Sequence, residues 1–160
     1  MNIKKNQTGF ILIDSLFAIT VTTVALFSLI GLVTMGTRAY LLNTEQSRAY
    51  QVAASYGDGM QSVTITDWKT TVQAASYQTI DVNNNAGFST YLANARNNRD
   101  AFKTAFADAA DVSVAVSARL SDAADINDRL AQVKIVVSWN QGQKNVQLIK
   151  YYVRDTDQAI

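Results

Sequence analysis

The 160-residue sequence contains no cysteine, no histidine and no proline. Without cysteine the chain forms no disulfide and offers no thiol chemistry, and without cysteine or histidine we expect no zinc site. A serine–histidine–aspartate triad is impossible. The 14 basic and 13 acidic residues leave a formal charge of +1, so nothing indicates a nucleic-acid footprint across the fold. We predict no catalytic residue, cofactor, metal or small-molecule substrate, and nucleic acid is not an expected partner.

A long run without charge lies near the N-terminus. Residues 15–37 are 23 consecutive uncharged positions, most of them Leu, Ile, Val, Phe or Ala. At about 1.5 Å per residue, a helix of this length rises roughly 34 Å, which is enough to cross a hydrocarbon core of about 30 Å. We predict a membrane-spanning half at about 10–35. Because Lys4 and Lys5 precede it, the positive-inside rule predicts a cytoplasmic N-terminus and an exported C-terminal part.

Asp14 is a carboxylate at the start of this apolar region. A carboxylate at the middle of a bilayer costs about 2.5–3.5 kcal/mol on insertion scales, and less near the interface. No Lys, Arg or His lies within reach on the same span, so a partner must come from another chain or from a new amino terminus. A cut between Gly9 and Phe10 would create such an amine four residues before Asp14. The alternative is an ordinary single-pass anchor whose Asp14 reaches the membrane interface.

Residues 4–14, with the apolar run that follows, resemble the class III signal of type IV prepilins and pseudopilins. The resemblance implies that residues 1–9 are a leader ending at Gly9, that a prepilin peptidase cuts before Phe10, and that the Phe10 amine is methylated. It also implies that Asp14 pairs with the Phe10 amine of an adjacent subunit. A conventional secretory signal fits less well, because its apolar region spans about 7–15 residues and ends at a small-residue cleavage site.

Two positions depart from the pattern of that family. Asp14 stands where the family usually has Glu, one methylene longer. Gly31 lies about where major pilins often have a helix-breaking Pro. The second difference favours a minor pilin or a pseudopilin over a major pilin.

The resemblance implies a structural subunit of a type IV pilus or related filament, with a minor pilin as the first expectation. Its partners would be prepilin peptidase, other pilin subunits through the N-terminal helix, and the cytoplasmic membrane before assembly. It would then pass from the inner membrane into an extracellular pilus or a periplasmic or cell-wall filament. The alternatives are a pseudopilin of a type II secretion or competence (DNA-uptake) system, and a single-pass membrane-anchored binding or enzymatic domain.

The sequence predicts one N-terminal helix over residues 10–60 and one globular exported domain over residues 61–160. Beyond the membrane the helix becomes amphipathic, with one stripe that we expect to face a core. The stripe consists of Met35, Ala39, Leu42, Gln46, Ala49, Ala53, Tyr56 and Met60. Glu45 and Arg48 fall on other faces, at a spacing that allows them to pair with each other.

Short elements are expected next. Thr66 or Asp67 is placed to cap a helix through Ala75, with Trp68 and Val72 inward, although residues 63–66 also suit a short strand. Residues 81–87 have oxygen-bearing side chains at alternate positions, as a calcium loop does. Their Gly comes one residue late, and Leu92 stands where such a loop needs a bidentate Glu, so we predict a surface turn at Asp81.

A second helix is predicted from Ser89, acting as its cap, to about Ala110. The middle of this predicted helix, at residues 97–99, is polar, so the sequence is compatible with an interruption of the helix there. The apolar side consists of Tyr91, Leu92, Ala95, Phe102, Phe106 and Ala109. A small basic cluster, formed by Arg96, Arg99 and Lys103, is expected to be a solvated face rather than a DNA-uptake surface.

Alternating apolar residues predict three antiparallel strands at residues 112–120, 133–139 and 146–153. A turn at 140–143 places Gly142 where a positive φ is needed. In the connection 121–128, Asp122, Asp125 and Asp128 are expected to be solvated acids rather than calcium ligands.

These elements predict an α+β fold: a long N-terminal helix packed on an antiparallel sheet of about three strands, with one or two short helices between. This layout is similar to that of type IV pilins. The V-x-W-x-x-G pattern at 137–142 also resembles the corresponding region of PilV-type minor pilins.

Overall fold

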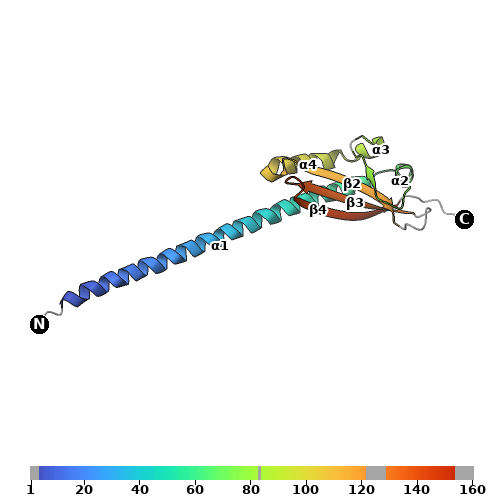
Figure 1. The fold of residues 1–160 in the computed structure, drawn as a ribbon. Coiled ribbons are helices and arrows are strands. Elements are labelled where there is room, and N and C mark those ends of the chain that lie inside the picture. Colours follow the sequence, from blue (N-terminus) through green and yellow to red (C-terminus); the bar gives the residue numbers. More distant parts are fainter. Residues whose placement is uncertain (1–3, 83, 122–128, 154–160) are drawn as a thin grey trace. The chain divides into compact units, whose positions relative to one another are not determined.

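The computed structural model describes residues 4–82, 84–121 and 129–153, with side chains from residue 13 onward (Figure 1). The chain has an α+β layout that begins with a 57-residue helix, α1 (Lys4–Met60). The later elements are α2 (Ile65–Thr71), β1 (Gln78–Ile80), α3 (Ala86–Ser89), α4 (Ala93–Ala105), the 3₁₀ turn η1 (Ala107–Ala109), β2 (Ser113–Leu120), β3 (Leu130–Trp139) and β4 (Lys144–Val153).

Contacts between residues divide the chain into two compact units, residues 1–44 and 45–160. α1 contributes its first part to one unit and its last part, from Glu45 onward, to the other. The prediction of a long N-terminal helix is confirmed, and the helix continues through Gly31 and Gly36 without interruption.

The strands form one antiparallel sheet in the order β1–β2–β3–β4 (Figure 1). The three predicted strands are present, but β1 makes a fourth that the sequence did not predict. β1 pairs Ile80 with Val116 of β2. Because β1 has three residues and only Ile80 is buried, it offers no alternating pattern to detect.

The inner face of the sheet carries the core of the 45–160 unit. Strand β3 alternates strictly, and its inward side chains are all buried. The buried side chains of the sheet are Ile80, Val116, Ala118, Leu120, Ala131, Val133, Ile135, Val137, Trp139, Val146 and Tyr152. The predicted inward residues of the strands at 112–120 and 133–139 are confirmed from Val116 onward, whereas Val112 and Val114 are only half-buried.

The last part of α1 packs on this core with one stripe of side chains. Its buried residues are Glu45, Ala49, Val52, Ala53, Tyr56 and Met60, which recur at helical spacing. The predicted stripe is therefore correct from Ala49 onward, but its polar member is Glu45, and Gln46 is exposed. Met35, Ala39 and Leu42 are also exposed, so the core-facing stripe begins later than predicted.

Two of the short helices differ from the predicted boundaries. The cap of α2 is Thr64, whose hydroxyl accepts a hydrogen bond from the Asp67 N–H, so neither Thr66 nor Asp67 is the cap. Trp68 and Val72 are buried as predicted. The helix predicted from Ser89 instead begins at Ala93 in α4, and it continues through residues 97–99 before it ends at Ala105.

Aromatic contacts join the short helices to the sheet. The ring of Trp68 stacks on Tyr152 of β4 at 5.1 Å and meets the edge of Phe88 at 4.9 Å between centroids. On α4, Phe102 meets Trp139 of β3 at 5.6 Å. These contacts place α2, α3 and α4 on the inner face of the sheet.

The turn between β3 and β4 has positive φ at three consecutive residues, Asn140, Gln141 and Gly142. The sequence predicted this for Gly142 alone. The Asp111 carboxylate accepts hydrogen bonds from the backbone N–H groups of Asn140, at 3.0 Å, and Gln141. Asparagine and glycine tolerate the left-handed conformation best, and the Asp111 contacts hold Gln141 in it as well.

Candidate functional site

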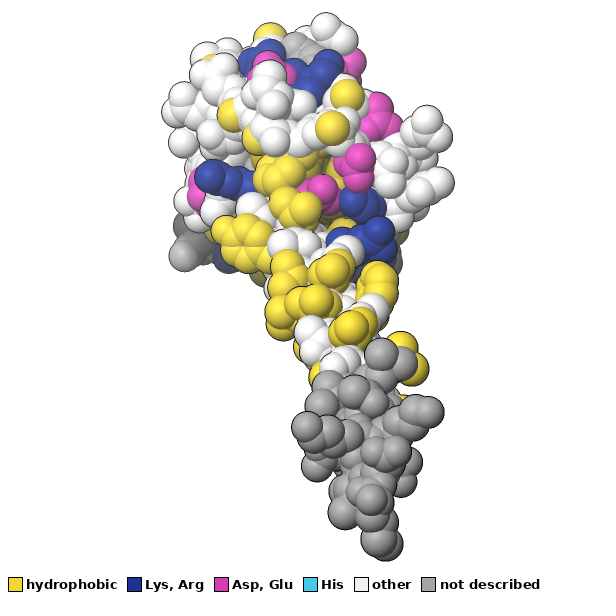
Figure 2. All heavy atoms as spheres, turned by 90° about the vertical axis from the view of Figure 1, so that its left-hand side faces the viewer, with side chains coloured by type: hydrophobic (Ala, Val, Ile, Leu, Met, Phe, Trp, Pro, Cys, Tyr) yellow, Lys and Arg dark blue, Asp and Glu magenta, His cyan; other side chains and the backbone are white. Residues whose placement is uncertain are grey.

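The first described part of α1 is apolar and exposed. Large side chains from Ile13 to Leu42 are at least about half exposed, and Phe17 and Phe27 reach 69% and 71%. Figure 2 shows hydrophobic side chains along this part of the helix. By length and composition, the helix from Ile13 to Met60 is able to cross a membrane. An apolar surface of this size needs an apolar environment, either lipid or other protein chains.

The hydroxyl groups of this segment are largely satisfied by the helix itself. Six of them donate to the carbonyl oxygen four residues earlier, as in the 2.7 Å bond from Thr20 to Leu16. The same bond is made by Thr23, Ser28, Thr34, Thr37 and Thr44. Such bonds allow hydroxyls to lie in apolar surroundings without water.

Asp14 is exposed, and within the described part of the chain no cation lies at ion-pair distance from it. The next basic residue toward the C-terminus is Arg38, 24 positions along the same helix. At about 1.5 Å per residue the two are roughly 36 Å apart along the axis. Asp14 therefore has no intramolecular partner within the described residues to offset its charge in an apolar environment.

Gly9 and Phe10, the residues of the predicted cleavage, lie within the backbone of α1. The side chain of Phe10 lies outside the described residues. Asp14 is the one predicted site residue whose side chain is placed.

A partly buried ion pair that the sequence did not predict lies in the 45–160 unit, between buried Glu45 and half-buried Lys144. The Lys144 ammonium is 2.7 Å from the Glu45 carboxylate and 3.0 Å from that of Asp108. Hydrogen bonds to these two carboxylates raise the pKa of Lys144 above its ordinary value. The predicted pairing of Glu45 with Arg48 is wrong, because Arg48 instead bonds to Gln51. Glu45 and Lys144 are 99 positions apart, so no local spacing signals their contact.

A shallow groove of about 240 Å³ lies between the last part of α1 and α4. It is lined by Arg48, Gln51, Val52, Asn98, Ala101, Phe102 and Ala105. The lining includes one cation and two amides but no carboxylate. The predicted basic cluster is only partly solvated, because Arg96 bonds to the Ser89 carbonyl and Arg99 pairs with Asp100 at 2.8 Å.

Acidic residues that could be ion ligands occur in two loops of the sequence, at Asp81 and at residues 122–128. Asp81 begins a turn, and its carboxylate accepts bonds from the backbone and side chain of Asn84 at 3.1 and 2.8 Å. Asp122, Asp125 and Asp128 lie outside the described residues. Among the described residues, no group of three or more Asp or Glu side chains is placed to hold a metal ion.

Comparison of the chain with protein-family models, with curated proteins and with solved structures gave no match.

Proposed function

We propose that the chain is a structural subunit of a type IV pilus or related filament, and that it is a minor pilin of that filament. In this proposal it is cut between Gly9 and Phe10, methylated at Phe10 and assembled through the first part of α1. The observation that carries the proposal is an exposed apolar helix segment with a single carboxylate, Asp14, which has no ion-pair partner among the described residues and follows the Gly9–Phe10 bond closely in the sequence.

The energetics of the apolar segment favour assembly over release into water. Exposing one Leu, Ile or Phe side chain to water costs about 1.5–3 kcal/mol relative to burying it. Residues 15–37 contain many such side chains, so a subunit leaves lipid only if neighbouring helices cover them. A filament of packed N-terminal helices provides that cover.

Asp14 supports the same proposal through its charge. An unpaired carboxylate in a helix bundle is strongly unfavourable, whereas one that meets an amine is compensated. The new amine of Phe10 on an adjacent subunit supplies that charge. The pair would both attract a correctly placed subunit and penalise a wrong register.

Intact mass and N-terminal sequencing test the processing step. We would analyse sheared surface filaments and membranes from the native host separately. A chain that starts at N-methylated Phe10 in the filament fraction is expected, and the same chain retained in the cell envelope would favour a pseudopilin. An uncut Met1 start confined to membranes would overturn the proposal and leave a single-pass anchored domain.

The docking role of Asp14 is tested by charge removal at constant size. Asp14→Asn is expected to abolish incorporation into filaments and leave cleavage after Gly9 intact, because the peptidase acts before subunits pair. Asp14→Glu should retain incorporation, and Asp100→Asn, which removes an exposed carboxylate of α4, should be silent. Normal incorporation of Asp14→Asn would disprove docking through this charge.

A further inference from the structure

The face of the sheet opposite the core carries an ordered row of polar and aromatic side chains. The strand register pairs Arg119 of β2 with Gln132 of β3, and Gln132 with Tyr151 of β4. Tyr77 directly precedes β1, whose Gln78 pairs with Ala118, so Tyr77 is next to Arg119. We call Tyr77, Arg119, Gln132 and Tyr151 the outer row. It crosses all four strands, roughly 14 Å at about 4.8 Å per strand.

Hydrogen bonds hold the outer row in a fixed arrangement. The amide oxygen of Gln132 accepts from the Arg119 Nε at 2.7 Å and from the Tyr77 hydroxyl at 2.9 Å. The amide nitrogen of Gln132 donates to the Tyr151 hydroxyl at 2.6 Å. Each of the four side chains is therefore positioned by a neighbour, and a ligand would lose little side-chain entropy on binding.

Two cations on this face have no acidic partner among the residues that the structure describes. Arg119 and Lys134 lie 4.9 and 4.8 Å from the centre of the Tyr77 ring. Within the described residues neither is at ion-pair distance from a carboxylate, although other cations of the domain are paired. The Tyr77 ring holds the two positive charges near each other at the protein surface.

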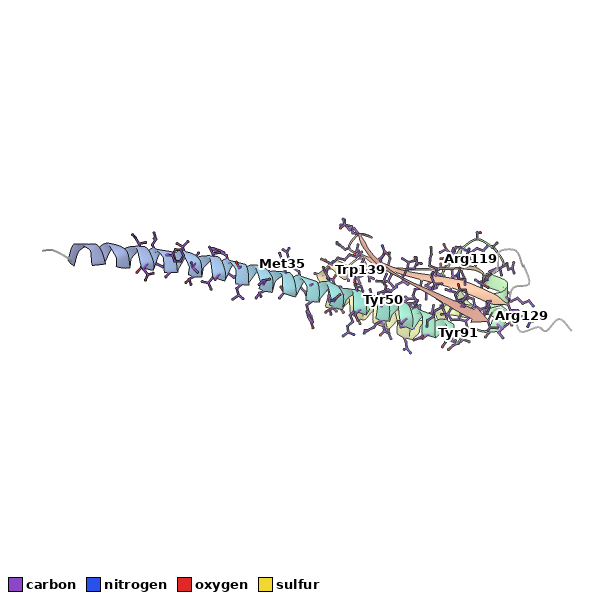
Figure 3. All side chains as sticks on the ribbon, turned by 90° about the horizontal axis from the view of Figure 1, so that it is seen from below. Met35, Tyr50, Tyr91, Arg119, Arg129 and Trp139 are labelled. Atoms are coloured by element: carbon purple, nitrogen blue, oxygen red, sulfur yellow. The ribbon has the colours of Figure 1, made fainter. Side chains whose placement is uncertain are left out.

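The outer row is accessible to solvent. None of its residues is buried, and Tyr151 is 57% exposed beside Ile149 at 43%. Figure 3 shows Arg119 on one side of the sheet, whereas Tyr91 is on the side of the helices. The helices of the domain pack on the inner face through residues such as Trp68 and Phe102.

We propose that this face binds an acidic polysaccharide whose sugars carry carboxylate groups. Arg119 and Lys134 would pair with carboxylates, and the exposed ring of Tyr151 would lie against the apolar face of a sugar ring. The hydroxyl and amide groups of the row would bond to sugar hydroxyls. The row spans roughly 14 Å, which suits an extended polymer lying across the strands, and the two cations select an anionic polymer over a neutral one.

Single-stranded nucleic acid fits the face less well. Such ligands are held by several aromatic rings on which successive bases stack. Here Arg119 and Lys134 already occupy the Tyr77 ring, so Tyr151 is the one ring of the outer row left for stacking. The proposal does not rest on filament assembly, because the outer row is formed within the 45–160 unit alone.

The test uses the full-length chain in detergent micelles with three probes: labelled polygalacturonate, neutral dextran of similar length, and an oligothymidylate. We expect binding to polygalacturonate that weakens with salt, and no binding to dextran. Lys134→Gln should weaken binding about tenfold, as expected for one charge-assisted hydrogen bond. Tyr151→Ala should weaken it by a similar factor.

The matched control is Lys103→Gln, which removes an exposed cation from α4 on the other side of the sheet. It should bind polygalacturonate like the unmodified protein, and circular dichroism and thermal unfolding should match for all variants. Equal loss in Lys103→Gln would overturn the assignment of the site, because attraction would then follow net charge. Absent binding to polygalacturonate, equal binding to dextran, or tighter binding to oligothymidylate would overturn the choice of ligand.

Discussion

The end of α1 makes a close approach that a single methyl group would disturb. A Cβ placed on Gly59 would lie 2.8 Å from the carbonyl oxygen of Tyr91 and 2.9 Å from Cδ2 of Leu92. Real Cβ atoms essentially never come this close, and the Tyr91 oxygen belongs to the backbone. Gly59→Ala would therefore force α1 and the segment before α4 apart.

Gly57 provides a matched control two positions earlier on the same helix. A Cβ there would meet the side chain of Lys150 at 2.9–3.0 Å, and the far end of that chain can turn away. Both substitutions reduce the entropy of the unfolded chain by the same amount and add the same helix propensity. Their difference in unfolding free energy thus isolates the packing cost at Gly59, which we place at about 1–3 kcal/mol, the range for overpacked sites.

The assay is chemical and thermal unfolding of both variants in detergent, followed by the fluorescence of the buried Trp68 and Trp139. For a domain of this size, a cost of 1–3 kcal/mol corresponds to a Tm difference of about 4–12 °C. We expect Gly57→Ala to unfold close to the unmodified protein and Gly59→Ala to unfold well before it. Equal stability of the two variants would show that the Tyr91 segment yields freely, and would refute the close-packing account.

Two other predictions concern charge and pH. Because Glu45 is almost fully buried beside Lys144, Glu45→Gln and Lys144→Met should each destabilise the domain, and a double-mutant cycle in urea should give a coupling of about 1–2 kcal/mol; additive effects would contradict a specific pair. Burial raises the pKa of Tyr152 above that of a free phenol, and hydrogen bonds raise that of Lys144, so the protonated forms belong to the folded state. The resulting stability is complete below about pH 10 and is lost as pH rises further. Tyr152→Phe should reduce this alkaline loss of stability when the free energy of unfolding is measured between pH 8 and 11. An unchanged dependence of that free energy on pH would show that the Tyr152 phenol does not cause the loss.

The sequence predicts best where the environment is uniform along an element. Val133, Ile135 and Val137 occupy every second position because β3 is a central strand with one buried face, and Val136 is the one apolar residue between them. The apolar run of α1 is equally clear in the sequence because apolar side chains lie on all faces of the helix. In both cases a single period identifies the element and its buried side.

Prediction fails where a distant contact decides the local structure. Glu45 is buried because Lys144 lies beside it, whereas Gln46 is exposed, and helical spacing alone cannot rank the two. Likewise β1 is held by its pairing with β2, and its three residues are too few to show an alternating pattern in the sequence. The outer row is visible only once the register aligns side chains from all four strands, which are up to 74 positions apart in the sequence.

Both parts of α1 are α-helical, but their side chains need different surroundings. From Glu45 onward a single stripe is buried, so one core satisfies the helix. In residues 13–37 every face is apolar, and many hydroxyls already bond to the preceding turn. Asp14 is therefore the group of this segment that depends most on solvation by water. An uncompensated charge costs far more in such surroundings than a free hydroxyl does. Asp14 is the one ionisable group of that segment, so a partner surface that buries it as a carboxylate needs a positive charge beside it, which is what the proposed pairing with the Phe10 amine supplies.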